Sequence, residues 1–91
     1  MNINQRKQSR YYKNIKRIDI SLTIIKDVSF MVNLIELDCG RTEITDVNML
    51  TNLKKLYCDS TKINNIDNLI NLTELICNSS MIINIDKLIN L

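Results

Sequence analysis

The sequence predicts an α/β-type repeat solenoid, in which short units stack and each adds one strand to a parallel β-sheet. First, one residue pattern recurs at a constant spacing of nineteen residues without an insertion. Second, part of each unit alternates apolar and outward-facing residues, which is the period of a short strand. Third, six apolar positions per unit bury too little surface to order the unit alone, so stacking has to supply the rest of the core.

The pattern reads L-x-x-L-x-C-x-x-T-x-I and occurs in three full copies. They comprise Leu34, Leu37, Cys39, Thr42 and Ile44; Leu53, Leu56, Cys58, Thr61 and Ile63; and Leu72, Leu75, Cys77, Ser80 and Ile82. A degenerate copy begins at Ile15, as is common for a terminal repeat. The sequence therefore predicts a repeat domain over residues 15–91, with units 15–33, 34–52, 53–71 and 72–90 and with Leu91 opening a further unit.

Within each unit, the predicted strand is followed by a loop or 3₁₀ segment rather than an α-helix. Leu56 and Cys58 alternate with Tyr57, which fits a strand. The second half has apolar residues at every third position, as in Ile44 and Val47. At about 100° per residue, spacing by three spreads these side chains around an α-helix, whereas a tighter turn keeps them on one side.

Two polar columns are predicted at the bends, where side-chain hydrogen bonds can satisfy unpaired backbone groups. They comprise Thr23, Thr42, Thr61 and Ser80, and Asn33, Asn52, Asn71 and Asn90. The cysteine column takes inward positions, so we expect all three thiols to be buried, reduced and structural. The chain has no His and no Cys-x-x-Cys motif, so we expect no catalysis, no metal site and no cofactor.

The outward strand positions carry the candidate partner-binding residues. One column alternates in charge and can pair across the sheet: Arg17, Glu36, Lys55 and Glu74. The next column does not neutralise itself: Asp19, Asp38, Tyr57 and Ile76. From both columns, the predicted partner-binding residues are Asp38, Tyr57, Ile76, Arg17 and Lys55.

The two ends of the sequence differ from its middle. Residues 1–14 are polar and basic and are predicted to be an arm or a cap, and residues 1–17 hold six bases and no acid. This segment offers an alternative function, binding to nucleic acid or another acidic surface. No signal or membrane-spanning pattern is seen, so we expect an intracellular protein. The sequence shows no polar capping segment after the last unit, so we expect self-association there or local disorder of residues 79–91.

The repeat resembles a leucine-rich repeat, and the phrase formed by residues 44–47 and 50–53 is similar to internalin-type repeats. The short cysteine-bearing unit, in a chain rich in Asn, Ile and Lys without Pro, resembles repeat proteins of giant DNA viruses. The usual Asn after the strand is replaced by Thr or Ser. The resemblance implies a right-handed coil with a parallel sheet on its concave face and a loop or 3₁₀ convex side. It also implies a non-catalytic protein-interaction scaffold that binds a protein through the concave face. A further alternative is that the chain is a fragment of a longer repeat array with no independent function.

Overall fold

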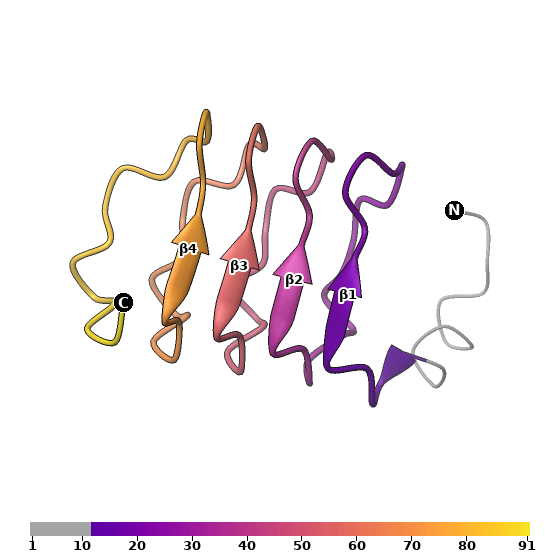
Figure 1. The fold of residues 1–91 in the computed structure, drawn as a ribbon, viewed down its shortest axis with the longest axis horizontal. Coiled ribbons are helices and arrows are strands. Elements are labelled where there is room, and N and C mark those ends of the chain that lie inside the picture. The colour runs from indigo at the N-terminus through magenta and orange to yellow at the C-terminus, as the bar shows by residue number, and fades with distance from the viewer. Residues whose placement is uncertain (1–11) are drawn as a thin grey trace.

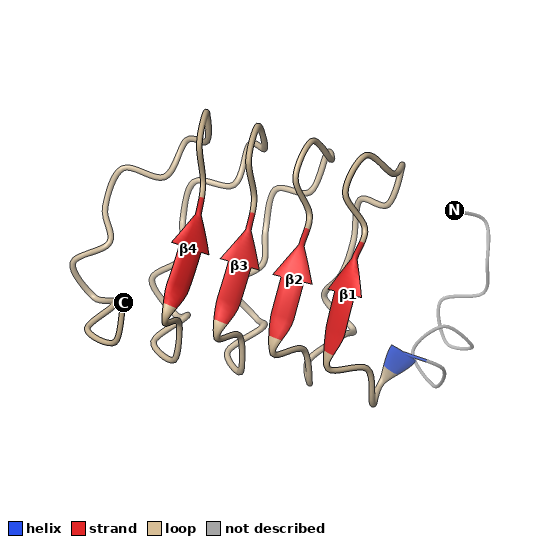
Figure 2. Ribbon diagram, viewed as in Figure 1, coloured by secondary structure: helices blue, strands red, loops and turns tan. Residues whose placement is uncertain are grey.

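The computed structural model describes residues 12–91 as a coil of four similar turns. Each turn contributes one three-residue strand: β1 (Arg17–Asp19), β2 (Glu36–Asp38), β3 (Lys55–Tyr57) and β4 (Glu74–Ile76). The strands form one sheet in chain order, β1-β2-β3-β4, with loops on the other side of the coil (Figures 1 and 2). The predicted repeat solenoid with a short parallel sheet is confirmed.

The strand register follows the repeat in the sequence. Each strand residue pairs in parallel with the residue nineteen positions later, as in Ile18 with Leu37 and Leu37 with Leu56. The same register continues from Leu56 to Leu75. Because the register never slips, equivalent side chains stack in columns, and every column of the sequence becomes a physical row across the sheet.

The core lies between the sheet and the loops. Leu37 and Leu56, at the middle of their strands, are fully buried, while the strand residues on either side are half-buried. The loop half of each central unit adds further side chains with no exposed surface, such as Val47 and Ile66. One continuous core of stacked apolar columns therefore joins the units, as expected for a solenoid.

The convex side consists of turns held by local hydrogen bonds. The Leu50 N–H donates to the Val47 carbonyl at 2.9 Å, and the Leu53 N–H donates to the Leu50 carbonyl at 3.1 Å. This three-residue spacing is that of a 3₁₀ turn, although no helix is formed between residues 15 and 91. A further column, Asp27, Asp46, Asn65 and Asn84, accepts the N–H two residues ahead at 2.8–2.9 Å. These turns satisfy backbone donors that a helix would otherwise pair.

Both predicted bend columns form hydrogen bonds to the backbone. The Thr61 hydroxyl donates to the Cys58 carbonyl at 2.8 Å, and Thr23 and Thr42 make the equivalent bond. In the asparagine column, Asn71 Nδ2 donates to the Thr51 carbonyl of the preceding unit at 3.0 Å. Asn33, Asn52 and Asn90 do the same. The threonine column therefore holds each bend closed, while the asparagine column ties successive units together.

The repeat register extends further toward the N-terminus than the sequence indicates. Asn33 Nδ2 donates to the Lys13 carbonyl at 2.6 Å, and the Ile15 N–H donates to the Tyr12 carbonyl at 3.1 Å, as in the later units. The Tyr12 ring packs beside Phe30 with centroids 6.2 Å apart. Tyr12 thus covers the outer side of the first unit. Residues 1–11, with most of the predicted basic arm, lie outside the described residues, so that arm and its nucleic-acid alternative stay predictions.

The last unit is more open than the central ones. Leu75, Cys77 and Ile82 are half-buried, and Ile85 is 45% exposed, whereas its equivalent Ile66 is 0% exposed. The expectation that all three cysteines are buried is therefore wrong for Cys77, because no described unit packs on its outer side. Cys39 and Cys58 are buried, and all three thiols are free. Among the described residues, no helix is long and apolar enough to cross a membrane.

Candidate interaction surface at the strand ends

The first outward column is an ion-pair ladder across the sheet. Arg17 Nε lies 3.1 Å from Glu36 Oε2, Lys55 Nζ lies 3.5 Å from Glu36 Oε1, and Lys55 Nζ lies 3.8 Å from Glu74 Oε2. The predicted charge pairing is confirmed. The pairs are largely exposed, so each stabilises the fold little. Their charges nevertheless neutralise one another and leave this column little net charge to attract a partner.

Asp19 opens the second outward column and is satisfied within its own turn. Its Oδ1 accepts the Ser21 hydroxyl at 2.6 Å and the Ser21 N–H at 2.9 Å. These two hydrogen bonds, the hydroxyl first, lower the pKa of the Asp19 carboxyl. Asp38, the next residue in the column, accepts the Gly40 N–H at 3.1 Å. The two carboxylates therefore fix the bend that follows each strand.

Tyr57 joins the two columns. Its hydroxyl donates to Glu74 Oε2 at 3.1 Å, and its ring is half-buried against the sheet. Partial burial and then the hydrogen bond to Glu74 raise the pKa of the Tyr57 hydroxyl. The ring is held from one end, so it presents a fixed aromatic face with little rotamer freedom left to lose.

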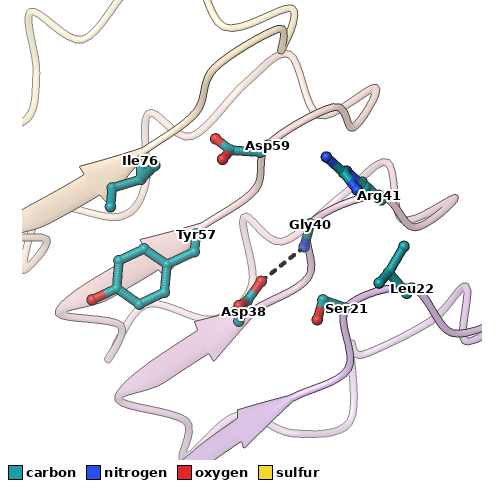
Figure 3. A pocket seen from close by; sticks show the side chains of 8 residues that line it. All are labelled: Ser21, Leu22, Asp38, Gly40, Arg41, Tyr57, Asp59 and Ile76. Carbon is teal, nitrogen blue, oxygen red and sulfur yellow. Dashed lines mark hydrogen bonds between the residues drawn. The ribbon is translucent and has the colours of Figure 1, made fainter.

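A hollow of about 490 Å³ lies at the carboxyl ends of the strands. We call it the strand-end hollow. It is lined by Ser21, Leu22, Asp38, Gly40, Arg41, Tyr57, Asp59 and Ile76 (Figure 3). Tyr57 and Ile76 lie at one end, and Leu22 and Arg41 lie at the other. Three of the predicted partner-binding residues, Asp38, Tyr57 and Ile76, therefore meet at one site.

The other two predicted residues lie elsewhere. Lys55 belongs to the ion-pair ladder. Arg17 lines a smaller hollow of about 340 Å³ over the strands themselves, which Asp38 and Tyr57 border from the other side. Both bases already pair with Glu36, so the geometry separates them from the strand-end hollow.

The turn after each strand shapes the strand-end hollow. Leu22, Arg41, Ser60 and Ser79 occupy the same repeat position and all have positive φ, between 55° and 60°. This left-handed conformation reverses the chain sharply, although it is unfavourable for residues other than glycine. Gly40 stands just before one of these residues, where an added Cβ would lie 3.4 Å from Asp38 Oδ1 and 3.5 Å from the Asp59 carbonyl oxygen. Gly40 therefore contributes only backbone atoms to the lining of the hollow.

Sequence reasoning missed Arg41 and Asp59, which line the hollow from the turns. Their columns vary between units, as in Ser21, Gly40, Asp59 and Asn78, so no repeated residue type marks them. Asp59 Oδ1 accepts the Asn78 N–H of the next unit at 2.7 Å, which holds its carboxylate over the hollow. The change of residue type from unit to unit was the signal that could have found them, because a repeat position that varies in this way is not needed for stacking.

The cysteines lie beneath the sheet and do not take part in this surface. Burial first, and then the neighbouring Cys58 thiol, raise the pKa of Cys39 to about 12. Burial first, and then the Cys77 thiol, raise the pKa of Cys58 to about 12. Since the thiolate is the nucleophile, these two groups are inert at neutral pH. Within residues 12–91, no group of three or more His, Cys, Asp or Glu side chains could hold a metal ion.

Comparison with known proteins rests on structure. No family model matches the sequence, and neither does any curated protein. An internalin of Listeria monocytogenes, inlF, superimposes with a TM-score of 0.72 at 22% identity over 87% of this chain and 27% of that one. Internalin C2 of the same organism gives 0.70 at 25% identity over 86% of this chain and 38% of that one. The chain thus spans less than two fifths of either neighbour.

The repeat pattern, the parallel strand of each unit and the internalin-like coil agree with one another. The molecule has the fold of a leucine-rich repeat protein.

Proposed function

We propose that the chain is a non-catalytic scaffold that binds a partner protein through the outward face of its sheet, which is the concave face of such a solenoid. The strand-end hollow is the observation that supports this function. It brings Asp38, Tyr57 and Ile76 together beside an ion-pair ladder that is already neutral. A held aromatic ring beside an apolar side chain is typical of the residues that dominate protein interfaces.

Binding through this face can be tested with proteins captured by the full chain and then purified. Tyr57→Ala removes the ring, and Asp38→Asn removes a charge while keeping the Oδ1 that accepts the Gly40 N–H. We expect each to weaken binding by about 1–3 kcal/mol, or roughly fivefold to 150-fold. Denaturant unfolding should show little change in stability for either variant.

The matched control is Lys62→Ala, which changes an exposed residue beyond the turn of the same unit. We expect this variant to bind as the unchanged chain does. A captured protein whose affinity is insensitive to Tyr57→Ala and Asp38→Asn would contradict the proposal, since it would bind elsewhere. Loss of folding in Tyr57→Ala would place the ring in the core instead of the interface.

Self-association through the last unit is a second proposal. It is supported by Ile85 and Leu91, which take inward repeat positions yet are each 45% exposed. The outer edge of β4 adds backbone groups that no other strand of residues 12–91 pairs, a combination that favours association between chains. We expect light scattering over a concentration series to detect oligomers that Ile85→Lys reduces. The control is Ile24→Lys, which changes a 77% exposed residue of the first unit. A monomer at every concentration would contradict this second proposal.

A further inference from the structure

The strand-end hollow contains two carboxylates that form no ion pair with another residue of the range 12–91. Asp38 and Asp59 are both half-buried, and one oxygen of each accepts a backbone N–H, from Gly40 at 3.1 Å and from Asn78 at 2.7 Å. Within residues 12–91, every ion pair involves other acids: Glu36, Glu74 and Asp67. The second oxygen of each carboxylate therefore keeps its negative charge available at the hollow.

The bases of the sheet strands do not line this hollow, although Arg17 shares the smaller hollow over the strands with Asp38 and Tyr57. Arg17 and Lys55 pair with the glutamates of the ladder. Lys16 and Lys54 line a different hollow of about 340 Å³, together with three asparagines of the bend column that precedes the strands. The strands thus separate a basic end from an acidic end. A partner that approaches the strand-end hollow meets negative charge in a partly desolvated site, where screening by salt is weaker than in bulk water.

An apolar wall stands beside the two carboxylates. The Tyr57 ring and the Ile76 side chain, which is 40% exposed, border the hollow at its end nearest β4 (Figure 3). Lysine and arginine combine an apolar stem with a cationic head, so one such side chain can cover the wall and reach a carboxylate at once. A cation near the face of a tyrosine ring gains further electrostatic stabilisation.

We propose that the strand-end hollow receives a lysine or arginine side chain of the partner protein, flanked in the partner by apolar residues. The cationic head lies between Asp38 and Asp59, and its stem lies against Tyr57 and Ile76. This inference rests on the proposed function, because it assigns the chemistry of the partner that binds the same face.

Arg41 offers a way to test whether the hollow binds a cationic side chain. Within residues 12–91 it is the one base that lines the hollow, it is exposed, and its backbone has a positive φ of 56°. Its positive charge at the hollow repels an incoming cation. Replacing it with glutamine should therefore strengthen cation binding, a gain that a damaged fold could not produce.

The test uses two small probes, the Nα-acetylated tripeptide amides Leu-Lys-Leu and Leu-Glu-Leu, titrated into the full chain and followed by amide chemical shifts. We expect the lysine peptide to shift the amides of residues 38–41 and 57–59, with at least about fivefold weaker binding of the glutamate peptide. Asp38→Asn with Asp59→Asn keeps both Oδ1 acceptors and should weaken the lysine peptide by about the same factor. Arg41→Gln should strengthen it about twofold.

Asp46→Asn is the matched control, because Asp46 also accepts a backbone N–H, from Asn48 at 2.9 Å, but lies on the convex side. It should leave binding unchanged. Equal binding of both peptides, no shift at residues 38–41 and 57–59, or weaker binding by Arg41→Gln would overturn the inference. The proposed function fails separately, if the captured proteins are insensitive to Tyr57→Ala. A captured partner that needs Tyr57 but tolerates both Asp→Asn changes would keep the function and remove the cationic assignment.

Discussion

The central units and the last unit have almost the same apolar residues, yet they bury them differently. Leu56 and Ile66 have no exposed surface, whereas Leu75 is half-buried and Ile85 is 45% exposed. The backbone differs in the same way. The Cys58 N–H donates to the Ile76 carbonyl at 2.8 Å, while the equivalent Cys77 N–H has no acceptor among the described residues. Identical residues thus receive different burial and different hydrogen bonding.

This difference shows that a unit depends on the unit that follows it for part of its burial and hydrogen bonding. The inward direction of a side chain is set by its own unit, but the cover over it comes from its neighbour, as expected for a quasi-one-dimensional fold. Stability therefore concentrates between residues 34 and 71, where both sides are covered. The strand-end hollow draws most of its lining from the same stretch, so it is held by the best-packed part of the molecule.

The largest predicted effect is on the free energy of unfolding, when equivalent leucines of a central unit and of the last unit are each replaced by alanine. Leu56→Ala should lower the free energy of unfolding by about 2–5 kcal/mol, because a fully buried side chain leaves a cavity. Leu75→Ala, in the half-buried equivalent, should cost about half as much. Urea unfolding of both variants measures the difference. Equal losses would show that the last unit is packed as well as the central ones.

The second effect concerns alkaline pH. The buried Cys39 and Cys58 thiols have a pKa of about 12 in the folded chain and 9.0 without burial. Above pH 9 the unfolded chain therefore loses these protons first, so stability is fully present below pH 9 and falls as pH rises toward 12. By pH 10 we expect a loss of about 1.4 kcal/mol per thiol.

Cysteine substitutions separate this effect from other groups that titrate at alkaline pH. The double variant Cys39→Ala with Cys58→Ala should unfold with a smaller pH dependence above pH 9 than the unchanged chain does. Urea unfolding at pH 8, 9 and 10 compares the slopes. The same slope in both proteins would mean that the two central thiols are not buried.

The smallest effect tests the left-handed turns. Ser60→Gly should stabilise the fold by about 0.5 kcal/mol, because glycine adopts the observed φ of 55° without a steric cost. Ser79→Gly should give less, since the Ser60 N–H donates to the Asn78 carbonyl of the next unit at 2.9 Å, whereas the Ser79 N–H has no backbone acceptor among the described residues. Ser60→Ala retains the Cβ and is the control. A gain in thermal midpoint for Ser60→Ala as large as that for Ser60→Gly would argue against strain at this position.

Much of the fold could be predicted from the sequence, because the residues that stack the units recur at fixed repeat positions. The hydrogen bonds of the threonine and asparagine columns, and the ion-pair ladder, could be predicted from residue type and the period of the repeat. The side-chain exposure of Cys77 and Ile85 could not be predicted for each residue, since it depends on whether a neighbouring unit packs against them. Tyr12 was missed because an aromatic ring replaces the leucine of later units.

The candidate site was predictable only in part. Asp38, Tyr57 and Ile76 share one outward strand column, so period alone groups them. Arg41 and Asp59 enter the hollow from turns, and the left-handed backbone at Arg41 shapes one of these turns. Neither a strand period nor a repeated residue type encodes that geometry.

Native-state amide exchange of Cys58 and Cys77 tests most directly whether each unit is completed by the next. We expect the Cys58 amide to exchange only through global unfolding, and the Cys77 amide to exchange at least about a hundredfold faster through local opening. The measurement should be made at several protein concentrations, so that protection gained by self-association is recognised by its dependence on concentration. Equal protection of the two amides at the lowest concentration would contradict the account.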